Sequence, residues 1–293
     1  MRIGLIGAGA VGQSVGALLV AGGWCRELFV ASGSQASAHG LAADLEDLTQ
    51  VTGSAMRVTV TTPKAMGACD AVVLSPRAHF TNTAVRDVRM AGLIANTALI
   101  VHLARQLTGY TGVAVMVTNP VDVLARVFAE RSGCARVVGI GAATDTARYR
   151  LTLARHLGVP AAAVRGHVIG EHGDAAVICA STTTVHGEPV TVPVQRVRDE
   201  LAARPRRISD GIGRTRLGPA GAVLDALTHS LGLADGVTEV SVRQETGVWL
   251  GMPVHYTDGI PTLCPPPLDD SESAQLDAAT EKLHTAYRLT EEI

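Results

Sequence analysis

The sequence predicts an α/β protein in which a doubly wound parallel sheet is followed by a mixed α+β region. Short apolar runs alternate with helix-length segments through the first half of the chain, which is typical of parallel strands joined by crossover helices. A glycine-rich turn directly follows the first of these runs, and the regular alternation ends near residue 143. We therefore expect two domains, residues 1–142 and residues 143–293.

Five apolar runs define the predicted parallel sheet. They are four or five residues long and rich in Val, Ile and Leu, which indicates strands buried on both faces, with right-handed connections between them. The runs are IGLI (3–6), LFVA (28–31), RVTV (57–60), AVVL (71–74) and VAVMV (113–117). A long helical pattern begins near Val88, after the fourth run.

The second half mixes helical and extended patterns, which favours an α+β domain packed on the first. Helices are predicted near 144–157, 195–212 and 219–233 and from about Ser271, and strands near 163–169, 176–193, 237–243 and 247–256. The segment PTLCPPPLDDSESAQL contains three consecutive prolines before an acidic helix start. We interpret it as a connection rather than a domain linker.

The composition indicates a globular protein that acts on a small molecule. With 293 residues and 47% hydrophobic content, the chain can bury a large core. The formal net charge is -2 and no Lys/Arg-rich run occurs, so we expect no nucleic acid partner. No apolar stretch reaches the roughly 20 residues of a membrane span, so we expect no membrane partner.

The cysteines and the N-terminus bear on the cellular compartment. The five cysteines are scattered and show neither CxxC nor metal-ligand spacing. We therefore expect no metal and a reducing, cytoplasmic environment. The N-terminal MRIGLIGAGAVG superficially resembles a signal peptide, but its glycine pattern explains it better. The cysteines are Cys25, Cys69, Cys134, Cys179 and Cys264.

The glycine turn predicts a dinucleotide-binding (Rossmann) domain. Gly7, Gly9 and Gly12 form GxGxxG, with Ala10 and Val11 between the last two, immediately after the first strand and at the start of a helix. The first glycine allows the tight turn, the second lets the backbone approach a pyrophosphate, and the third lets helix pack on strand. The alternative is a chance match in a chain with 31 glycines, which the register of strand, motif and helix argues against.

The end of the second strand bears on the choice between NAD and NADP. An acidic residue at this point would hydrogen-bond the adenosine ribose of NAD. Here the strand runs into Ser32, Gly33 and Ser34 without an acid. Hydroxyls and backbone amides could accept a 2'-phosphate, so we expect NADP or NAD, with a preference for NADP. The arginine usually expected beside that phosphate is also missing.

Three further motifs follow in order along the chain. They are TNPVD (118–122) after the fifth strand, TDTARYR (144–150) on a helix and GEHGD (170–174) after a strand. Together with the glycine turn, they make the chain similar to the lactate/malate dehydrogenase family over nearly its full length. The resemblance implies a nicotinamide-binding domain, an α+β substrate domain, and a homodimer or homotetramer that reversibly reduces a 2-oxo acid to a 2-hydroxy acid.

The resemblance also implies the roles of four residues. His172 would exchange a proton with the substrate oxygen, Asp145 would orient it, and Arg148 would grip the substrate carboxylate. Asn119 would form a hydrogen bond beside the nicotinamide and the substrate. These residue types suit the chemistry, because imidazole titrates near neutrality and a guanidinium can hold a carboxylate with two hydrogen bonds.

Each of the four residues also has a structural interpretation when taken alone. His172 lies in a glycine loop, Asp145 at a helix start where the macrodipole favours an acid, and Arg148 on a helix face open to solvent. Asn119 precedes a proline, as turn residues do. Their joint occurrence with the glycine turn favours an active site.

The segment SPRAHFTNTAVRD (75–87) resembles the family's loop that closes over the substrate and carries an arginine that polarises the carbonyl. Counting forward from the fourth strand places that arginine at Arg86, whereas counting back from the next helix places Thr83 there. The two counts differ by three residues, so this loop or the first turn after it is shorter than usual. We prefer Arg86, because threonine cannot supply a cation.

The forward count places Phe80 at the family's specificity position. An aromatic ring there cannot pair a second carboxylate, and an unpaired buried charge costs several kcal/mol. The segment LGPAGAV (217–223), which includes Pro219, is similar to the region facing the substrate side chain and is built of small residues. We expect an apolar substrate side chain larger than methyl, and not malate. The alternative is that Phe80 packs on the protein itself.

Two other functions stay open at this stage. The chain could be a catalytically repurposed or inactive dinucleotide-binding protein, in keeping with the missing ribose-binding acid, the shortened loop and Phe80. It could also reduce a ketone or an imine without a carboxylate, although Arg148 would then have no evident purpose.

Overall fold

The computed structural model describes residues 1–80 and 90–293. Its centre is an eleven-stranded sheet in the order β3-β2-β1-β4-β5-β6-β12-β13-β8-β9, with β14 paired to β13. The first six strands are β1 (Arg2–Ile6), β2 (Glu27–Ala31), β3 (Arg57–Val60), β4 (Ala71–Leu74), β5 (Val113–Met116) and β6 (Val137–Gly139). The helices between them are α1 (Ala10–Gly22), α2 (Gln35–Thr52), α3 (Leu93–Gln106) and α4 (Val121–Ser132), with short 3-10 turns at Pro63–Ala68 and Met90–Gly92.

The first six strands are parallel and confirm the predicted doubly wound sheet. The strand order reverses between β1 and β4, so the connections that leave their carboxyl ends diverge and open a crevice there. All five predicted strands are present. The sixth, β6, was not predicted because its three residues, VVG, give too short an apolar run to recognise.

The second half extends the same sheet. Its elements are α5 (Ala142–Leu157), a 3-10 turn (Ala161–Ala163), β7 (Val164–Arg165), β8 (Val168–Gly170), β9 (Ala176–Ile178), β10 (Thr184–Val185), β11 (Glu188–Pro189), α6 (Val194–Ile212), α7 (Leu217–Ser230), β12 (Gly236–Arg243), β13 (Trp249–Thr257), β14 (Ile260–Leu263) and α8 (Asp270–Arg288). β12 pairs antiparallel with β6 through Ser241 and Gly139. Because one sheet runs through both halves, the division at residue 143 stays a prediction.

Two expectations for the second half were wrong. The first residues of PTLCPPPLDDSESAQL are not a plain connection, since Ile260–Leu263 form β14, which pairs with β13. Pro261 is tolerated there because an edge strand need not donate on its open side. The run 176–193, expected as extended structure, holds only the short strands β9, β10 and β11.

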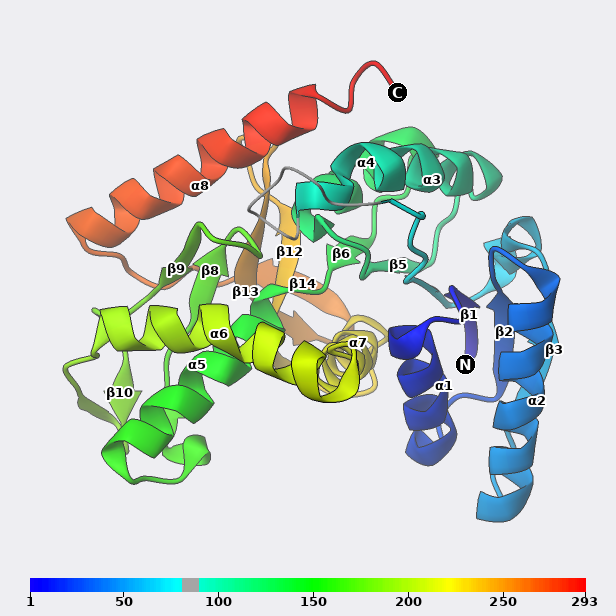
Figure 1. Cartoon of the computed structure of the whole chain (residues 1–293), viewed down its shortest axis with the longest axis horizontal. Helices are drawn as coiled ribbons and strands as arrows, with labels where there is room; N and C mark the ends of the chain where they lie inside the picture. Colours follow the sequence, from blue (N-terminus) through cyan, green and yellow to red (C-terminus); the bar gives the residue numbers. More distant parts are fainter. Residues whose placement is uncertain (81–89) are drawn as a thin grey trace.

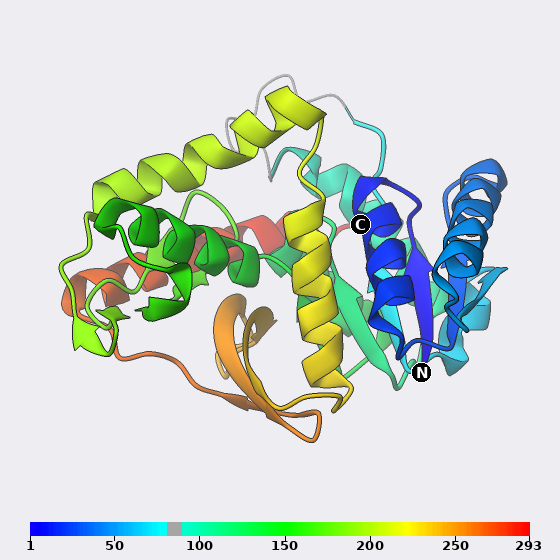
Figure 2. The ribbon, with the colours of Figure 1, turned by 90° about the horizontal axis from the view of Figure 1, so that it is seen from below.

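The core consists of layers on both faces of the sheet. Alternate residues of β4 point to opposite faces: Val72 and Leu74 pack with α3 and α4, whereas Ala71 and Val73 pack with α1 and α2. α8 lies along β8 and β9 and reaches α4 (Figure 1), and α7 stands between α1 and α5 (Figure 2). In the part of the chain that the structure describes, no helix is both long enough and apolar enough to cross a bilayer.

Candidate active site

The glycine turn forms the floor of the crevice between β1 and β4. Gly7 has φ +114°, and a Cβ there would lie 2.7 Å from the backbone carbonyl carbon of Ser75. A Cβ at Gly12 would lie 1.9 Å from the carbonyl oxygen of Gly7, so α1 can pack on the turn only with glycine at that position. Gly9 has nothing within 4 Å of its would-be Cβ. The open space at Gly9 suits the close approach of a pyrophosphate.

The first turn of α1 provides hydrogen-bond donors to this space. The helix begins at Ala10, and Gly9 caps it without a side-chain hydrogen bond. The first backbone N–H groups of a helix have no acceptor within the helix, which makes this end a binding site for anions. The N–H groups of Ala10, Val11 and Gly12 belong to this turn, so these residues fit the phosphates of a dinucleotide.

Serine hydroxyls cluster where β2 ends. Ser34 caps α2, and Ser37 Oγ donates a hydrogen bond to Ser32 Oγ over 2.8 Å. Ser34 Oγ in turn donates to Ser37 Oγ over 2.9 Å. The first turn of α2 contains no acidic residue. The region that would face the adenosine ribose therefore holds hydroxyls and a helix N-terminus, with Gly33 exposed between them.

His172 and Asp145 meet across the start of α5. His172 Nδ1 lies 2.6 Å from Asp145 Oδ2, and both side chains are largely buried, with 11% and 7% of their surface exposed. Arg148 Nη1 lies 3.3 Å from Asp145 Oδ1, so one carboxylate contacts both residues. Gly141 makes the approach possible, because a Cβ there would lie 2.5 Å from His172 Cβ. The structure thus brings together three of the predicted site residues.

The first turn of α4, which follows the loop after β5, holds the backbone of His172. Asp122 Oδ2 accepts a hydrogen bond of 2.8 Å from the backbone N–H of His172. Burial raises the pKa of Asp122 to about 6. The sequence motif contained Asp122, but we assigned it no role. The available signal was an acid in the first turn of a helix that follows directly on a buried strand.

Asn119 lies in the same loop with an unsatisfied side chain. Its Oδ1 is buried and has no hydrogen-bond partner among the residues that the structure describes. Its backbone oxygen accepts from Asn96 Nδ2 over 2.8 Å, which fixes the loop to α3. A buried amide oxygen without a partner is costly unless a ligand supplies the donor. Asn119 therefore fits contact with a nicotinamide or a substrate.

Phe80 packs against other residues in the part of the chain that the structure describes. A Cβ built on Gly92 would lie 2.6 Å from the nearest atom of the Phe80 ring. The Arg77 guanidinium stacks 4.6 Å from the ring centroid. Burial and the nearby charge of Arg214 lower the pKa of Arg77. These contacts support the alternative interpretation of Phe80 as a packing residue.

Two predicted residues of the loop, Arg86 and Thr83, lie outside the described residues, so the role of Arg86 stays a prediction. Pro219 lies in the first turn of α7. A Cβ on the neighbouring Gly218 would lie 3.8 Å from Thr144 Cγ2, which brings the start of α7 beside the start of α5. The small-residue segment thus begins near Asp145, and its expected place facing the substrate side chain stays a prediction.

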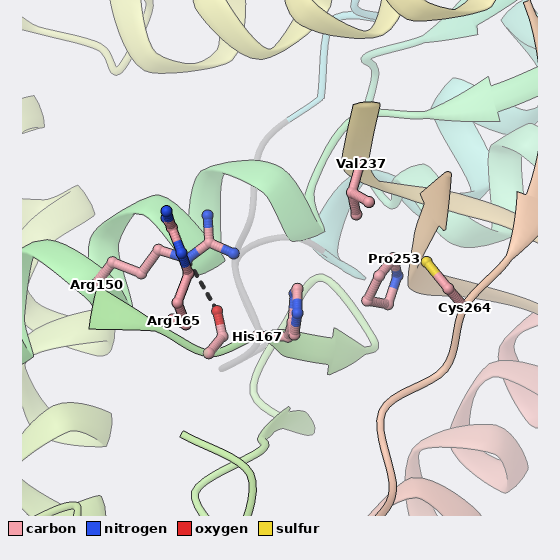
Figure 3. A pocket seen from close by; sticks show the side chains of 7 residues that line it. Arg150, Arg165, His167, Val237, Pro253 and Cys264 are labelled. Atoms are coloured by element: carbon pink, nitrogen blue, oxygen red, sulfur yellow. Dashed lines mark hydrogen bonds between the residues drawn. The ribbon is translucent and has the colours of Figure 1, made fainter. Parts of the chain in front are cut away.

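A hollow of about 380 Å³ lies apart from this group (Figure 3). Arg150 donates to the Gly166 carbonyl oxygen and to Glu239, and His167 Nδ1 lies 2.7 Å from Glu239. None of the predicted site residues that the structure describes lines this hollow. Within residues 1–80 and 90–293, no group of three or more His, Cys, Asp or Glu side chains could hold a metal ion.

The parallel sheet with the glycine turn between β1 and α1 is typical of a dinucleotide-binding α/β protein, and His172, Asp145 and Arg148 form a buried group in its second half. Comparison with known families specifies the class further. Residues 1–141 match the family model described as lactate/malate dehydrogenase, NAD binding domain, and residues 143–205 match its alpha/beta C-terminal domain. The chain belongs to the lactate/malate dehydrogenase family.

Individual relatives are similar at modest identity. The L-lactate dehydrogenase of Staphylococcus saprophyticus is 32% identical over 193 residues, which are 64% of this chain and 60% of that enzyme. The chain thus spans about 60% of the length of this relative. The L-lactate dehydrogenase of Limosilactobacillus reuteri is 28% identical over 302 residues, 96% of this chain and 92% of that enzyme.

Solved structures show the same fold in enzymes of both names. A lactate dehydrogenase from a Medee basin deep-sea metagenome superposes with a TM-score of 0.90 at 22% identity, covering 99% of this chain and 98% of the other. The malate dehydrogenase of Cryptosporidium parvum superposes with a TM-score of 0.88 at 22% identity and covers 100% of both chains. The fold therefore does not separate lactate from malate as the substrate.

Proposed function

We propose that the protein is a nicotinamide-dependent 2-hydroxy acid dehydrogenase that interconverts a 2-oxo acid and a 2-hydroxy acid. The observation that carries the proposal is the buried contact of His172 with Asp145, whose carboxylate also contacts Arg148. Family membership supports it, since the model matching the first half describes an NAD-binding domain.

The side chains suit each part of this reaction. When bound, the reduced nicotinamide supplies the hydride to the carbonyl carbon. Negative charge then develops on the carbonyl oxygen, which takes a proton from His172 Nε2. Asp145, at Nδ1, fixes the ring orientation and stabilises the imidazolium that donates this proton. Arg148 orients the substrate by its carboxylate. In the reverse direction, neutral His172 accepts the proton of the 2-hydroxyl group.

We propose further that the protein accepts NADP as well as NAD. The support is the hydroxyl cluster of Ser32, Ser34 and Ser37 and the absence of an acid in the first turn of α2. A carboxylate at this place would repel a 2'-phosphate, whereas hydroxyls and helix N–H groups can bind one. The ratio of kcat/KM for NADPH and NADH with the same 2-oxo acid measures this preference. A ratio below about 0.01 would exclude NADP as a working cofactor.

The proposed substrate carries an apolar side chain larger than methyl. Support comes from the family resemblance, which places Phe80 at the specificity position, and from the small residues near Pro219 at the start of α7. The contacts of Phe80 with Arg77 and beside Gly92 favour a packing role for the ring instead. The specific observation that favours oxaloacetate instead is Arg77, whose cation stacks on the Phe80 ring. Substitution of Arg77 by Ala separates the two: it should lower kcat/KM for oxaloacetate selectively if this arginine pairs a second carboxylate.

A substrate panel tests the proposed function. Pyruvate, oxaloacetate, phenylpyruvate and 2-oxoisovalerate are each offered with NADH and with NADPH, and oxidation of the cofactor is followed by absorbance. Phenylpyruvate or 2-oxoisovalerate should be the best substrate, and His172→Asn should abolish turnover. A thermal shift with the cofactor but no turnover of any acid would favour the inactive dinucleotide-binding protein. Light scattering would test the proposed homodimer or homotetramer.

A further inference from the structure

The loop that carries His172 folds around the carboxylate of Glu171. This side chain is 2% exposed, and its Oε2 accepts a hydrogen bond of 2.9 Å from the backbone N–H of Ala175. A Cβ at Gly173 would lie 2.5 Å from the Glu171 carboxyl carbon. The carboxylate therefore occupies the inside of the turn, where a substituted residue 173 would displace it.

The C-terminal helix supplies the cation for this carboxylate. Lys282, on α8, lies with its Nζ 2.8 Å from Glu171 and 33% of its side chain exposed. The two residues are 111 positions apart in the sequence. α8 is itself fixed on the far side of the loop, because Glu272 accepts hydrogen bonds from the backbone and the hydroxyl of Ser181. α8 runs beside β8 and β9, the two strands that flank this loop (Figure 1).

We infer that Lys282 is a positioning residue for catalysis, which acts through Glu171 to fix the loop that presents His172. The inference rests on the proposed function. His172 is held at its ring by Asp145 and at its backbone N–H by Asp122. The pair Glu171–Lys282 provides a third attachment at the preceding residue. Three attachments determine the placement of the ring more tightly than two.

Lys282 also affects the electrostatic field at His172. Three carboxylates approach His172 from three elements: Asp122 on α4, Asp145 on α5 and Glu171 on its own loop. Among residues 1–80 and 90–293, the cations that contact these carboxylates are Arg148 on α5 and Lys282 on α8. Removal of Lys282 leaves the buried Glu171 without compensation, which is strongly unfavourable. The additional negative field would favour the protonated imidazole of His172.

The composition offers a matched control. Of the 25 Lys and Arg residues, only Lys64 and Lys282 are lysines. Lys64 is exposed in the 3-10 turn before β4, and its side chain forms no hydrogen bond or ion pair with the residues that the structure describes. Lys64→Met therefore removes the same charge and side chain at a position remote from the loop.

Steady-state kinetics of the full chain, with the best substrate of the panel and NADH, tests the inference. Lys282→Met should lower kcat by about 10- to 100-fold, because a displacement of about 1 Å can cost that much. The KM for NADH should change less than about twofold. Lys282→Arg should recover most of kcat, and Lys64→Met should match the wild type. Binding of NADH by fluorescence shows that each variant is folded.

The pH profile separates positioning from a merely structural role. In reduction, kcat/KM falls as the pH rises and protonated imidazole is lost; in Lys282→Met this descending limb should move to higher pH. The double variant Glu171→Gln/Lys282→Met removes both charges, while the introduced glutamine would still accept the hydrogen bond from the backbone N–H of Ala175. The pH at which kcat/KM falls should therefore return toward the wild-type value.

Each outcome has a distinct meaning. If the wild type turns over no acid of the panel, the proposed function fails. If the wild type is active and Lys282→Met has the same kcat and pH profile as Lys64→Met, the positioning role of Lys282 is refuted. A Lys282→Met variant with reduced thermal stability but unchanged kcat and pH profile would equally refute it.

Discussion

Substitution of Asp145 by Asn perturbs the buried contact on which the proposed mechanism depends. Asn has the same shape, but its amide would donate to His172 Nδ1, which lies 2.6 Å from Asp145 Oδ2. The imidazole would then carry its proton on Nε2 as a neutral ring. Such a ring is a poor acid in reduction and cannot accept a proton at Nε2 in oxidation. Both directions of the reaction should therefore slow.

The magnitude follows from the lost charge-assisted hydrogen bond. A hydrogen bond to a charged group contributes about 1.5–3 kcal/mol, and each 1.4 kcal/mol corresponds to about tenfold in rate. The low exposure of both side chains, 11% and 7%, leaves little screening by solvent. We expect kcat/KM to fall by about 10- to 200-fold in each direction.

The assay compares Asp145→Asn with Asp210→Asn, which removes an exposed carboxylate on α6. Reduction of the 2-oxo acid and oxidation of the 2-hydroxy acid are both measured. Asp210→Asn should retain full activity, and both variants should bind NADH as the wild type does. Retention by Asp145→Asn of more than half of the wild-type kcat/KM would refute the role given to the His172–Asp145 pair.

Three further predictions concern the cofactor and the buried acid. Gly12→Ala should weaken NADH binding by more than about tenfold, because its Cβ would lie 1.9 Å from the Gly7 oxygen. Gly40→Ala, at a position with open space around the added Cβ, should leave NADH binding unchanged. Fluorescence titration measures both affinities. Ser32→Asp should lower the NADPH/NADH ratio of kcat/KM by at least about tenfold, since a carboxylate repels the 2'-phosphate; an unchanged ratio would contradict the cofactor proposal. Burial raises the pKa of Asp122 to about 6 from 3.8, so the folded protein binds this proton more tightly and loses stability as the pH rises from about 4 to 6. Asp122→Asn should remove that loss, so its free energy of unfolding in urea, relative to the wild type, should increase across this window.

Local patterns were sufficient to predict the parallel sheet but not its extension. The strand AVVL is buried on both faces, so it appears in the sequence as a continuous apolar run. Gly12 is required by its close contact with Gly7 in the same motif, so the motif alone was enough to predict the turn. β6 and β14 were not predicted. β6 has only three residues, too few to show a periodicity, and Pro261 in β14 resembles a turn signal rather than part of an edge strand. Their pairing is determined by tertiary contacts.

Motifs were sufficient to predict which residues lie together, whereas the roles of these residues stay predictions. His172, Asp145 and Arg148 were expected together because the family resemblance links their motifs, and the structure places them in contact. The hydrogen bond from His172 to Asp122 and the pair Glu171–Lys282 join residues 50 and 111 positions apart. Such contacts arise from packing, so no local pattern signals them.

Isotope transfer tests the central claim most directly. The protein is supplied with NADH or NADPH carrying deuterium at the transferable C4 position, together with the best 2-oxo acid of the panel, and the product is analysed by mass spectrometry and NMR. Direct hydride transfer predicts one deuterium at C2 of the 2-hydroxy acid, formed at a rate that His172→Asn abolishes. A product without deuterium at C2, or no product from any acid of the panel, would contradict the proposed reaction.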